Sequence, residues 1–313
     1  MGAVVVIAFA LIGATARMAT GASSGDGCAK APKRGTVVLT PKIDGRRRVV
    51  RVHVPPNLRA RAAAPLVLNL HGSQSTAQAQ EAFTGMDATA DQNSFLVAYP
   101  QAVITSGAGF DWNVPGQPLV GGAAVPKKAA DDVSFLEKTV ALLEKRNCVD
   151  PQRVYVTGFS GGARMASQLG CDASTTFAAI APVSGLRFPQ PCPGTRAVPV
   201  VAFHGTEDPI DPIDGNGQPY WTYSVETAAQ RWAAHDECSN IGIVADGKTL
   251  SRFEYVECSD KGSVVLYEVL GAGHEWPGGP PMPRRITRVL GPQSNAIDAD
   301  TTMWQFFAQH PLQ

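Results

Sequence analysis

The chain has 313 residues, of which 44% are hydrophobic and 17% are charged, so it can bury a large globular core. Lysine plus arginine and aspartate plus glutamate each number 27, which gives a formal net charge of zero. The only basic run is the triplet at 46–48, which is typical of a solvated strand edge. This charge balance predicts no nucleic-acid partner.

The amino terminus is apolar for about a dozen residues and continues into small residues with A-x-A spacing. Such a run is too short to span a bilayer and is typical of a secretory signal peptide. We therefore expect a signal peptide over residues 1–22 and one globular domain over 23–313. The mature protein would have no membrane span and would be extracellular, with the periplasm as the alternative.

Strands and helices are predicted to alternate along the remaining chain. Residues 36–40 and 47–55 alternate in polarity and predict an antiparallel pair at one edge of a sheet. Nearly continuous apolar runs predict parallel strands covered on both faces at 65–72, 94–100, 154–158, 177–185, 198–206 and 263–271. Helices are predicted between them, at 78–92, 131–145, 162–170, 225–234 and 299–308. The pattern predicts a single α/β domain with a mainly parallel central sheet and helices on both faces.

The six cysteines have no C-x-x-C spacing, which argues against a metal site and favours disulfides in an exported protein. Cys238 and Cys258 flank a predicted hairpin and are the first expected pair, followed by Cys171 with Cys192. Cys28 and Cys148 remain as the third pair. The order of the cysteines alone does not determine this connectivity.

The stretch VYVTGFSGGARMA at 154–166 places one serine between glycines directly after an apolar run. Gly158, Ser160 and Gly162 match G-x-S-x-G, in which a strand turns sharply into a helix and exposes a nucleophilic serine. The glycines remove side chains that would collide in that turn. Glycine-rich turns between a strand and a helix also occur in nucleotide-binding folds, so the motif alone leaves that alternative open.

A serine hydroxyl becomes a strong nucleophile only when a histidine takes its proton and a carboxylate orients the histidine. His71, His204 and His274 lie at the ends of predicted parallel strands. In α/β hydrolases the order along the chain is serine, acid, histidine, which selects His274 as the base. The other histidines lie away from these strand ends: His53, His235 and His310.

The acid should lie in the loop that follows the strand at 198–206. We predict Asp208, which comes soon after that strand. Asp211 precedes a proline, as a solvated loop residue would, and is the alternative. Asp214 precedes Gly215 and is typical of a turn.

An oxyanion hole needs two backbone N–H donors, one from the residue after the nucleophile and one from a loop after a core strand. Gly161 and Ser73 occupy those positions. His71, two residues before Ser73, is expected to be structural, packed under the same loop.

Several separated motifs give the chain a family resemblance over residue 34 to its end. They are LHGS (70–73), DDVSFL (131–136), RVYVTGFSGGARMA (153–166), FAAIAPVSG (177–185), FHGTEDP (203–209), GHEWPGG (273–279) and IDADTTMWQFF (297–307). The set resembles the secreted esterase family of polyhydroxybutyrate depolymerases and feruloyl esterases. This resemblance implies the α/β-hydrolase fold and a serine carboxylesterase without a cofactor. Its motif positions fall on Ser160, Asp208 and His274.

The resemblance also places Trp112 and Trp276 near the cleft, where they would bind a phenolic ring or a polyester chain. Packing in the core is the alternative for both. The chain departs from the family at Ser73, where many relatives have cysteine, and at Glu275, where threonine is common. Glu275 would either face the imidazole of His274 and favour its charged form, or point into solvent.

The expected substrate is an ester, either a feruloylated saccharide or a hydroxyalkanoate ester. No Thr/Ser-rich linker or separate binding domain follows the last motif, which favours soluble esters over solid polymer. Two other functional classes fit the same sequence features less well. A serine peptidase shares the catalytic groups but usually carries an additional domain in this fold, and a noncatalytic polymer- or carbohydrate-binding protein would not need all three groups at strand ends.

Overall fold

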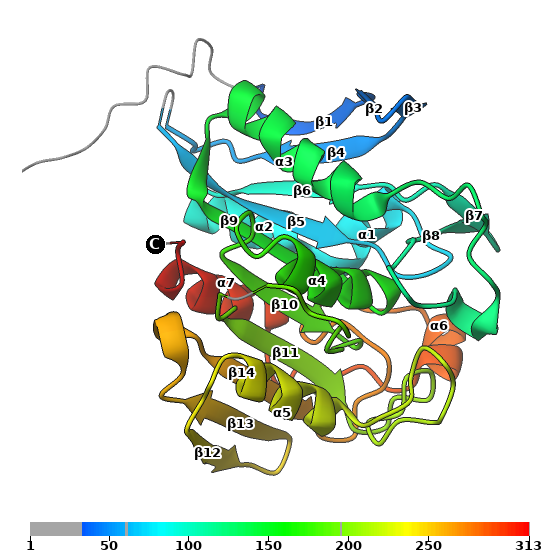
Figure 1. Cartoon of the computed structure of the whole chain (residues 1–313), viewed down its shortest axis with the longest axis vertical. Helices are drawn as coiled ribbons and strands as arrows, with labels where there is room; N and C mark the ends of the chain where they lie inside the picture. Colours follow the sequence, from blue (N-terminus) through cyan, green and yellow to red (C-terminus); the bar gives the residue numbers. More distant parts are fainter. Residues whose placement is uncertain (1–32, 60–61, 195, 313) are drawn as a thin grey trace, which may run out of the picture.

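A computed structural model describes residues 33–59, 62–194 and 196–312. The expected signal peptide at 1–22 and Cys28 lie outside these residues. The centre of the fold is a ten-stranded sheet, ordered β1-β4-β6-β5-β9-β10-β11-β14-β13-β12 (Figure 1). In that order the strands span Gly35–Leu39, Val50–Val54, Leu96–Pro100, Ala64–Leu70, Val149–Phe159, Ala179–Val183, Val200–Gly205, Val264–Val269, Leu250–Val256 and Asn240–Asp246.

The strands from β6 to β14 in this order run parallel, and antiparallel strands complete the sheet at both ends. The predicted mainly parallel sheet is therefore confirmed. The antiparallel pair β1–β4 forms one edge, as the alternating polarity of its residues predicted. At the other edge, the β12–β13 hairpin joins the sheet through β14.

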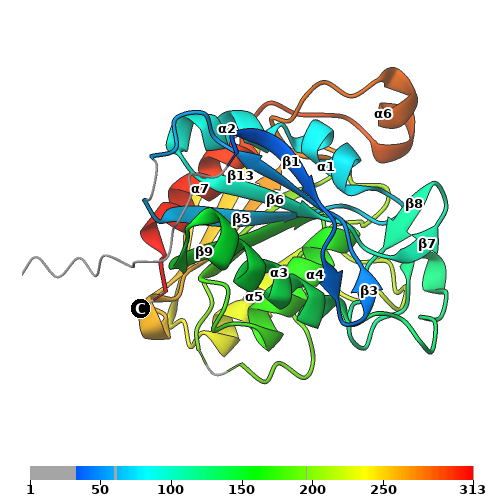
Figure 2. The same cartoon turned by 90° about the horizontal axis from the view of Figure 1, so that it is seen from above.

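Helices cover both faces of the sheet, as predicted (Figure 2). One face carries α3 (Asp132–Asn147), α4 (Gly161–Asp172) and α5 (Val225–His235), and the other carries α1 (Ala77–Thr84), α2 (Met86–Asn93) and α7 (Ala299–Gln309). Successive side chains of a strand point to opposite faces. Accordingly, Leu66 and Leu68 of β5 pack into the core on the α3–α4–α5 side, whereas Val67 packs into the core on the α1–α2–α7 side.

The helix expected over 78–92 is instead two helices, α1 and α2, which meet at Gly85. This glycine has φ 71°, a left-handed conformation, and its N–H donates to the carbonyl of Glu81, which ends α1. The same backbone conformation begins α2 in a new direction. A glycine can adopt this conformation without steric cost, which is why a continuous helical pattern is interrupted here.

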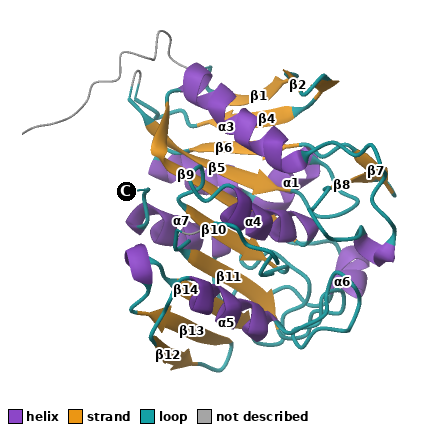
Figure 3. Ribbon diagram, in the orientation of Figure 1, coloured by secondary structure: helices purple, strands orange, loops and turns teal. Residues whose placement is uncertain are grey.

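Several short elements lie at the carboxyl ends of the parallel strands and were not predicted (Figure 3). The hairpin β7 (Ile104–Ser106) and β8 (Gly109–Asp111) follows β6, and the short helix α6 (Arg284–Leu290) follows β14. Ligands of open parallel sheets bind at this edge. These elements therefore lie at the edge of the sheet where a ligand site is expected.

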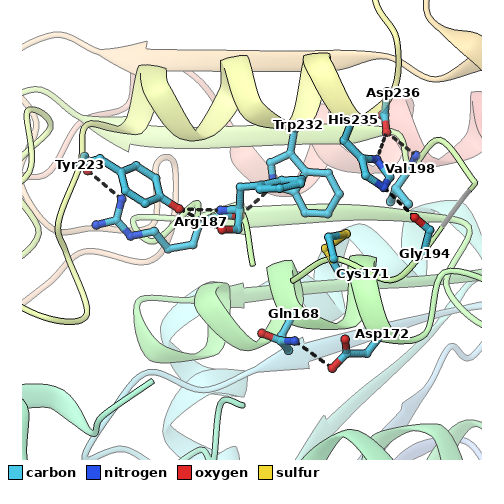
Figure 4. The surroundings of a disulfide bond; sticks show 12 residues. Gln168, Cys171, Asp172, Arg187, Gly194, Val198, Tyr223, Trp232, His235 and Asp236 are labelled. Atoms are coloured by element: carbon cyan, nitrogen blue, oxygen red, sulfur yellow. Dashed lines mark hydrogen bonds and ion pairs between the residues drawn. A yellow bond between two sulfur atoms is a disulfide. The ribbon is translucent and has the colours of Figure 1, made fainter. Parts of the chain in front are cut away.

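Two of the three expected disulfides are confirmed. Cys171, at the end of α4, is bonded to Cys192 in the loop before β11 (Figure 4), and Cys238 is bonded to Cys258 across the ends of the β12–β13 hairpin. The third pair stays a prediction because it includes Cys28. Among the helices of the described residues, none has the length and apolar character needed to cross a membrane.

Candidate active site

Ser160 occupies the turn between β9 and α4, in a strained backbone conformation with φ 54° and ψ −115°. Its N–H donates to the carbonyl of Val183 at 3.0 Å, which ties the turn to the neighbouring strand β10. A Cβ added to Gly158 would lie 2.5 Å from the carbonyl carbon of Gly162, and one added to Gly162 would collide with the carbonyl oxygen of Leu70. Both positions of the motif therefore require glycine.

Asp208 and His274 meet at the ends of two adjacent parallel strands, β11 and β14. The Nδ1 atom of His274 lies 2.7 Å from Oδ2 of Asp208, and both side chains are buried. An ionised carboxylate can only accept hydrogen bonds, so Nδ1 is the donor. This hydrogen bond fixes the imidazole tautomer that leaves Nε2 free to accept a proton.

The loop after β11 holds Asp208 as an anion. Its second oxygen, Oδ1, accepts from the N–H groups of Ile210 and Asp211, each at 2.8 Å. Burial by itself would raise the pKa of Asp208, but the hydrogen bond and electrostatic interaction with His274, together with His204 and the N–H of Asp211, outweigh it, so the pKa lies below its ordinary value. The carboxyl group is therefore ionised at neutral pH.

Asp211, the alternative acid, has a different place in the same loop. Its backbone N–H donates to Asp208, and its carbonyl oxygen accepts from Nε2 of His204 at 2.8 Å. Oδ2 of Asp211 is buried without a hydrogen-bond partner among the described residues. The geometry thus brings Asp208, and not Asp211, to the imidazole of His274.

Ser160 and His274 both line a cleft of about 940 Å³ at the carboxyl ends of the strands. The ring of Phe159 packs against that of His274, with centroids 4.7 Å apart. Apolar side chains dominate the rest of the lining: Phe83, Met282, Ile286, Val289 and Leu290. Most of these come from the segment that contains α6, so this helix makes one wall of the cleft.

Ser73 and Gly161 lie side by side next to the nucleophile turn. A Cβ added to Gly161 would collide with Oγ of Ser73 and would lie 3.1 Å from its backbone nitrogen. Gly161 is the first residue of α4, where N–H groups have no acceptor within the helix. Two backbone donors can therefore converge on an oxygen atom held beside Ser160.

The two tryptophans expected in the cleft are both core residues. Trp112 is buried and donates from Nε1 to the carbonyl of His71 at 2.7 Å. Trp276 is buried and donates to Oδ1 of Asp300 at 3.0 Å. Neither belongs to the described residues that line the cleft. Their aromatic surface is covered by packing, which corrects the expectation that they present flat surfaces to a substrate.

His71 lies in the core under its loop, as expected, and its Nε2 accepts from the N–H of Ala102 at 3.1 Å. Glu275 matches neither of its two expected orientations. It is buried, and both carboxylate oxygens accept from the N–H of Ser294 at 2.9 Å. Burial raises the pKa of Glu275 to about 7, and the Ser294 hydrogen bond opposes that shift only in part.

Two residues near the site were given no role from the sequence: His204, which was considered only as a candidate base, and Arg164. His204 lies 3.5 Å from Oδ2 of Asp208 and is fully buried. Its position four residues before Asp208 at a strand end was the available signal. Arg164 lies on the first turn of α4 and reaches Oγ of Ser73. Sequence offers no sign of that contact because the two residues are 91 positions apart.

The fold and the Asp208–His274 pair at its strand ends define an α/β hydrolase. The model of the family described as "Esterase PHB depolymerase" matches residues 50–230. The putative esterase NocK of Nocardia uniformis subsp. tsuyamanensis is 31% identical, with the match covering 83% of this chain and 79% of NocK. The chain belongs to this esterase family, and it is a carboxylesterase.

One further relative agrees with this assignment, and a solved structure agrees with the fold. Feruloyl esterase B of Piromyces equi is 27% identical over 72% of this chain, although the chain spans only 42% of that protein. The acetyl xylan esterase structure from Aspergillus awamori superposes with a TM-score of 0.54 at 16% identity, covering 82% of this chain and 99% of that one. At that identity, the structural likeness concerns the fold.

Proposed function

We propose that the protein is a secreted serine carboxylesterase of the feruloyl esterase and polyhydroxybutyrate depolymerase type, acting through Ser160, His274 and Asp208. The observation that carries this proposal is the buried hydrogen bond between His274 and Asp208 beside a cleft that also contains Ser160. The positive φ of Ser160 is the second support, since such strain at a non-glycine residue persists where the surrounding structure enforces it.

In this mechanism, Oγ of Ser160 attacks the ester carbonyl carbon while Nε2 of His274 takes the hydroxyl proton. The carbonyl oxygen becomes an anion that accepts from the N–H groups of Gly161 and Ser73. Collapse of the tetrahedral intermediate expels the alcohol, which takes the proton from His274, and leaves an acyl group on Ser160. Water then attacks the acyl-enzyme by the same steps and releases the acid.

The substrates we propose are a feruloylated saccharide or a hydroxyalkanoate ester. The apolar lining of the cleft by Phe83 and Ile286 supports an acyl group with substantial apolar surface. The two disulfides support an oxidising compartment and hence export, extracellular or periplasmic.

The test is the reaction of purified parent and Ser160→Ala proteins with a fluorophosphonate and with p-nitrophenyl butyrate. We expect the parent to be labelled on Ser160 and to turn over the ester. Ser160→Ala should fold, escape labelling and lose on the order of 10⁶-fold in kcat. Normal turnover by a folded Ser160→Ala protein would overturn the mechanism. Turnover of methyl ferulate and of hydroxybutyrate oligomers then distinguishes the two acyl classes. Hydrolysis of a matched anilide would identify a peptidase, and its absence would exclude one.

A further inference from the structure

Arg164 places a guanidinium directly beside the proposed oxyanion hole. It follows Ser160 by one helical turn, and its N–H donates to the carbonyl of Ser160 at 3.0 Å. The residue is only 4% exposed. Its Nη2 lies 3.5 Å from Oγ of Ser73 and would be 3.4 Å from a Cβ added to Gly161. The cation thus adjoins both residues whose N–H groups would hold the oxyanion.

Other buried arginines of the protein have close acceptors. Arg48 forms an ion pair with Asp132 at 2.6 Å. Arg187 donates to the carbonyl of Tyr223 at 2.7 Å (Figure 4). Arg48 and Arg187 each leave one nitrogen without a partner, whereas Arg164 leaves both Nε and Nη1 without one among the described residues, and its Nη2 has only the 3.5 Å contact with Ser73. Buried charges are normally paired, so this arrangement calls for a functional reason.

The groups around Arg164 offset its positive charge only at longer range. Asp211, Tyr220 and Asp111 favour the charged form, and the guanidinium lies 4.9 Å from the ring centroid of Tyr220. No carboxylate among the described residues accepts a hydrogen bond from Arg164 at its Nε or Nη1 atom. Burial lowers the pKa of Arg164, but an arginine remains protonated in proteins.

We propose that Arg164 is a positioning residue for the oxyanion hole, whose positive charge behind Ser73 and Gly161 stabilises the anionic tetrahedral intermediate. This inference rests on the proposed serine-esterase function. The ester carbonyl is neutral in the ground state and carries a full negative charge in the intermediate. A fixed cation in a buried, low-dielectric position therefore lowers the energy of the intermediate more than that of the bound substrate.

The experiment compares the parent with Arg164→Gln, Arg164→Met and Arg164→Lys on p-nitrophenyl butyrate. Glutamine can still donate a hydrogen bond toward Ser73 but carries no charge. Lysine keeps the positive charge but lacks the planar guanidinium group. We expect kcat to fall about 10- to 100-fold in the glutamine and methionine variants with little change in KM, which is less than the loss of a direct oxyanion donor. Lysine should restore most of the lost turnover.

A trifluoromethyl ketone, which forms a tetrahedral adduct on the serine, supplies a readout that a structural role would not move. Its inhibition constant should rise by the same factor as kcat/KM falls across the three variants. The inhibition constant of butyramide, a neutral ground-state analogue, should stay within about twofold of the parent value. Active-site titration with a fluorophosphonate corrects every rate for the folded fraction.

Arg187→Met is the matched control, because Arg187 is a buried arginine that does not contact Ser73 or Gly161. It should lower stability while leaving kcat per titrated site within about twofold of the parent. The inference is overturned if Arg164→Gln keeps the parent kcat, or if the ketone binds the variants as tightly as the parent. If the parent itself neither hydrolyses the ester nor reacts with the fluorophosphonate, the proposed function fails instead.

Discussion

His274 donates from Nδ1 to Oδ2 of Asp208 at 2.7 Å, across 66 residues of sequence. The two side chains meet because β11 and β14 are neighbouring parallel strands whose carboxyl ends lie at one edge of the sheet. Neither side chain is exposed to competing water, so the hydrogen bond holds the ring in one orientation.

Replacement of Asp208 by asparagine tests this relationship. An asparagine side chain can donate to Nδ1 and thereby favour the wrong imidazole tautomer, so we expect kcat to fall by up to about 10⁴-fold while the protein stays folded. Asp211→Asn is the matched control in the same loop and should change kcat by less than about tenfold. The larger loss in Asp211→Asn would show that the loop assignment is wrong.

Glu275 makes stability depend on pH near neutrality. Its pKa is about 7 in the folded protein against an ordinary value of 4.5, so between these values the native state binds a proton that the unfolded state has released. The free energy of unfolding contributed by this group therefore falls as pH rises through that window.

Glu275→Gln removes this dependence. At pH 8 the variant should be about 1 to 2 kcal/mol more stable than the parent. A shift of one pKa unit corresponds to about 1.4 kcal/mol, and solvent near Ser294 partly screens the charge of the Glu275 carboxylate, which reduces the full value. At pH 4 both side chains are neutral, and the difference should vanish. Urea denaturation at pH 4 and pH 8 measures the difference in the free energy of unfolding. An equal increase in stability at both pH values would refute the titration of Glu275 in this range.

Gly158→Ala should be strongly destabilising because the added Cβ would lie 2.5 Å from the backbone of Gly162. We expect a loss of about 3 kcal/mol or more, measured by urea denaturation together with the yield of soluble protein. Gly121→Ala is the control. Gly121 has φ 81° but open space around its Cβ position, so only the backbone cost of about 1 kcal/mol should appear. Similar losses in the two variants would contradict the steric explanation.

The Cys171–Cys192 disulfide closes a loop of 21 residues between α4 and the segment before β11. Replacing both cysteines by alanine should lower the free energy of unfolding by about 2 to 4 kcal/mol, with catalysis per folded molecule preserved. Peptide mapping of the unreduced protein should recover this linkage and the Cys238–Cys258 linkage. Recovery of either peptide with free thiols would contradict a structural role for the bond.

Ile286 of α6 should contribute to acyl-chain binding. Ile286→Ala removes apolar surface from the cleft wall, so kcat/KM for a p-nitrophenyl octanoate ester should fall roughly three- to tenfold, while the acetate ester should be little affected. Val38→Ala, on the edge strand β1, removes an apolar side chain that is 51% exposed away from the cleft and is the control. Equal losses of kcat/KM on both esters would show that Ile286 does not contribute to binding of the acyl chain.

The sequence by itself determined the parallel sheet, the helices on both faces, and the turn at Ser160. The periodicity of apolar residues specifies which side chains each element buries. The two glycines that flank Ser160 in the motif are typical of a sharp turn from a strand into a helix. Chain order and distance from the strand end singled out Asp208 and His274, because parallel strands bring their carboxyl ends to one edge whatever their separation in sequence.

Only the tertiary structure decided where individual side chains point. Trp112 and Trp276 are buried because core elements pack over them, and Glu275 turns to Ser294 rather than to His274 or to solvent. Arg164 reaches Ser73 only because α4 begins beside the loop after β5. Such contacts depend on the packing of elements far apart in sequence, which neither periodicity nor a local motif encodes.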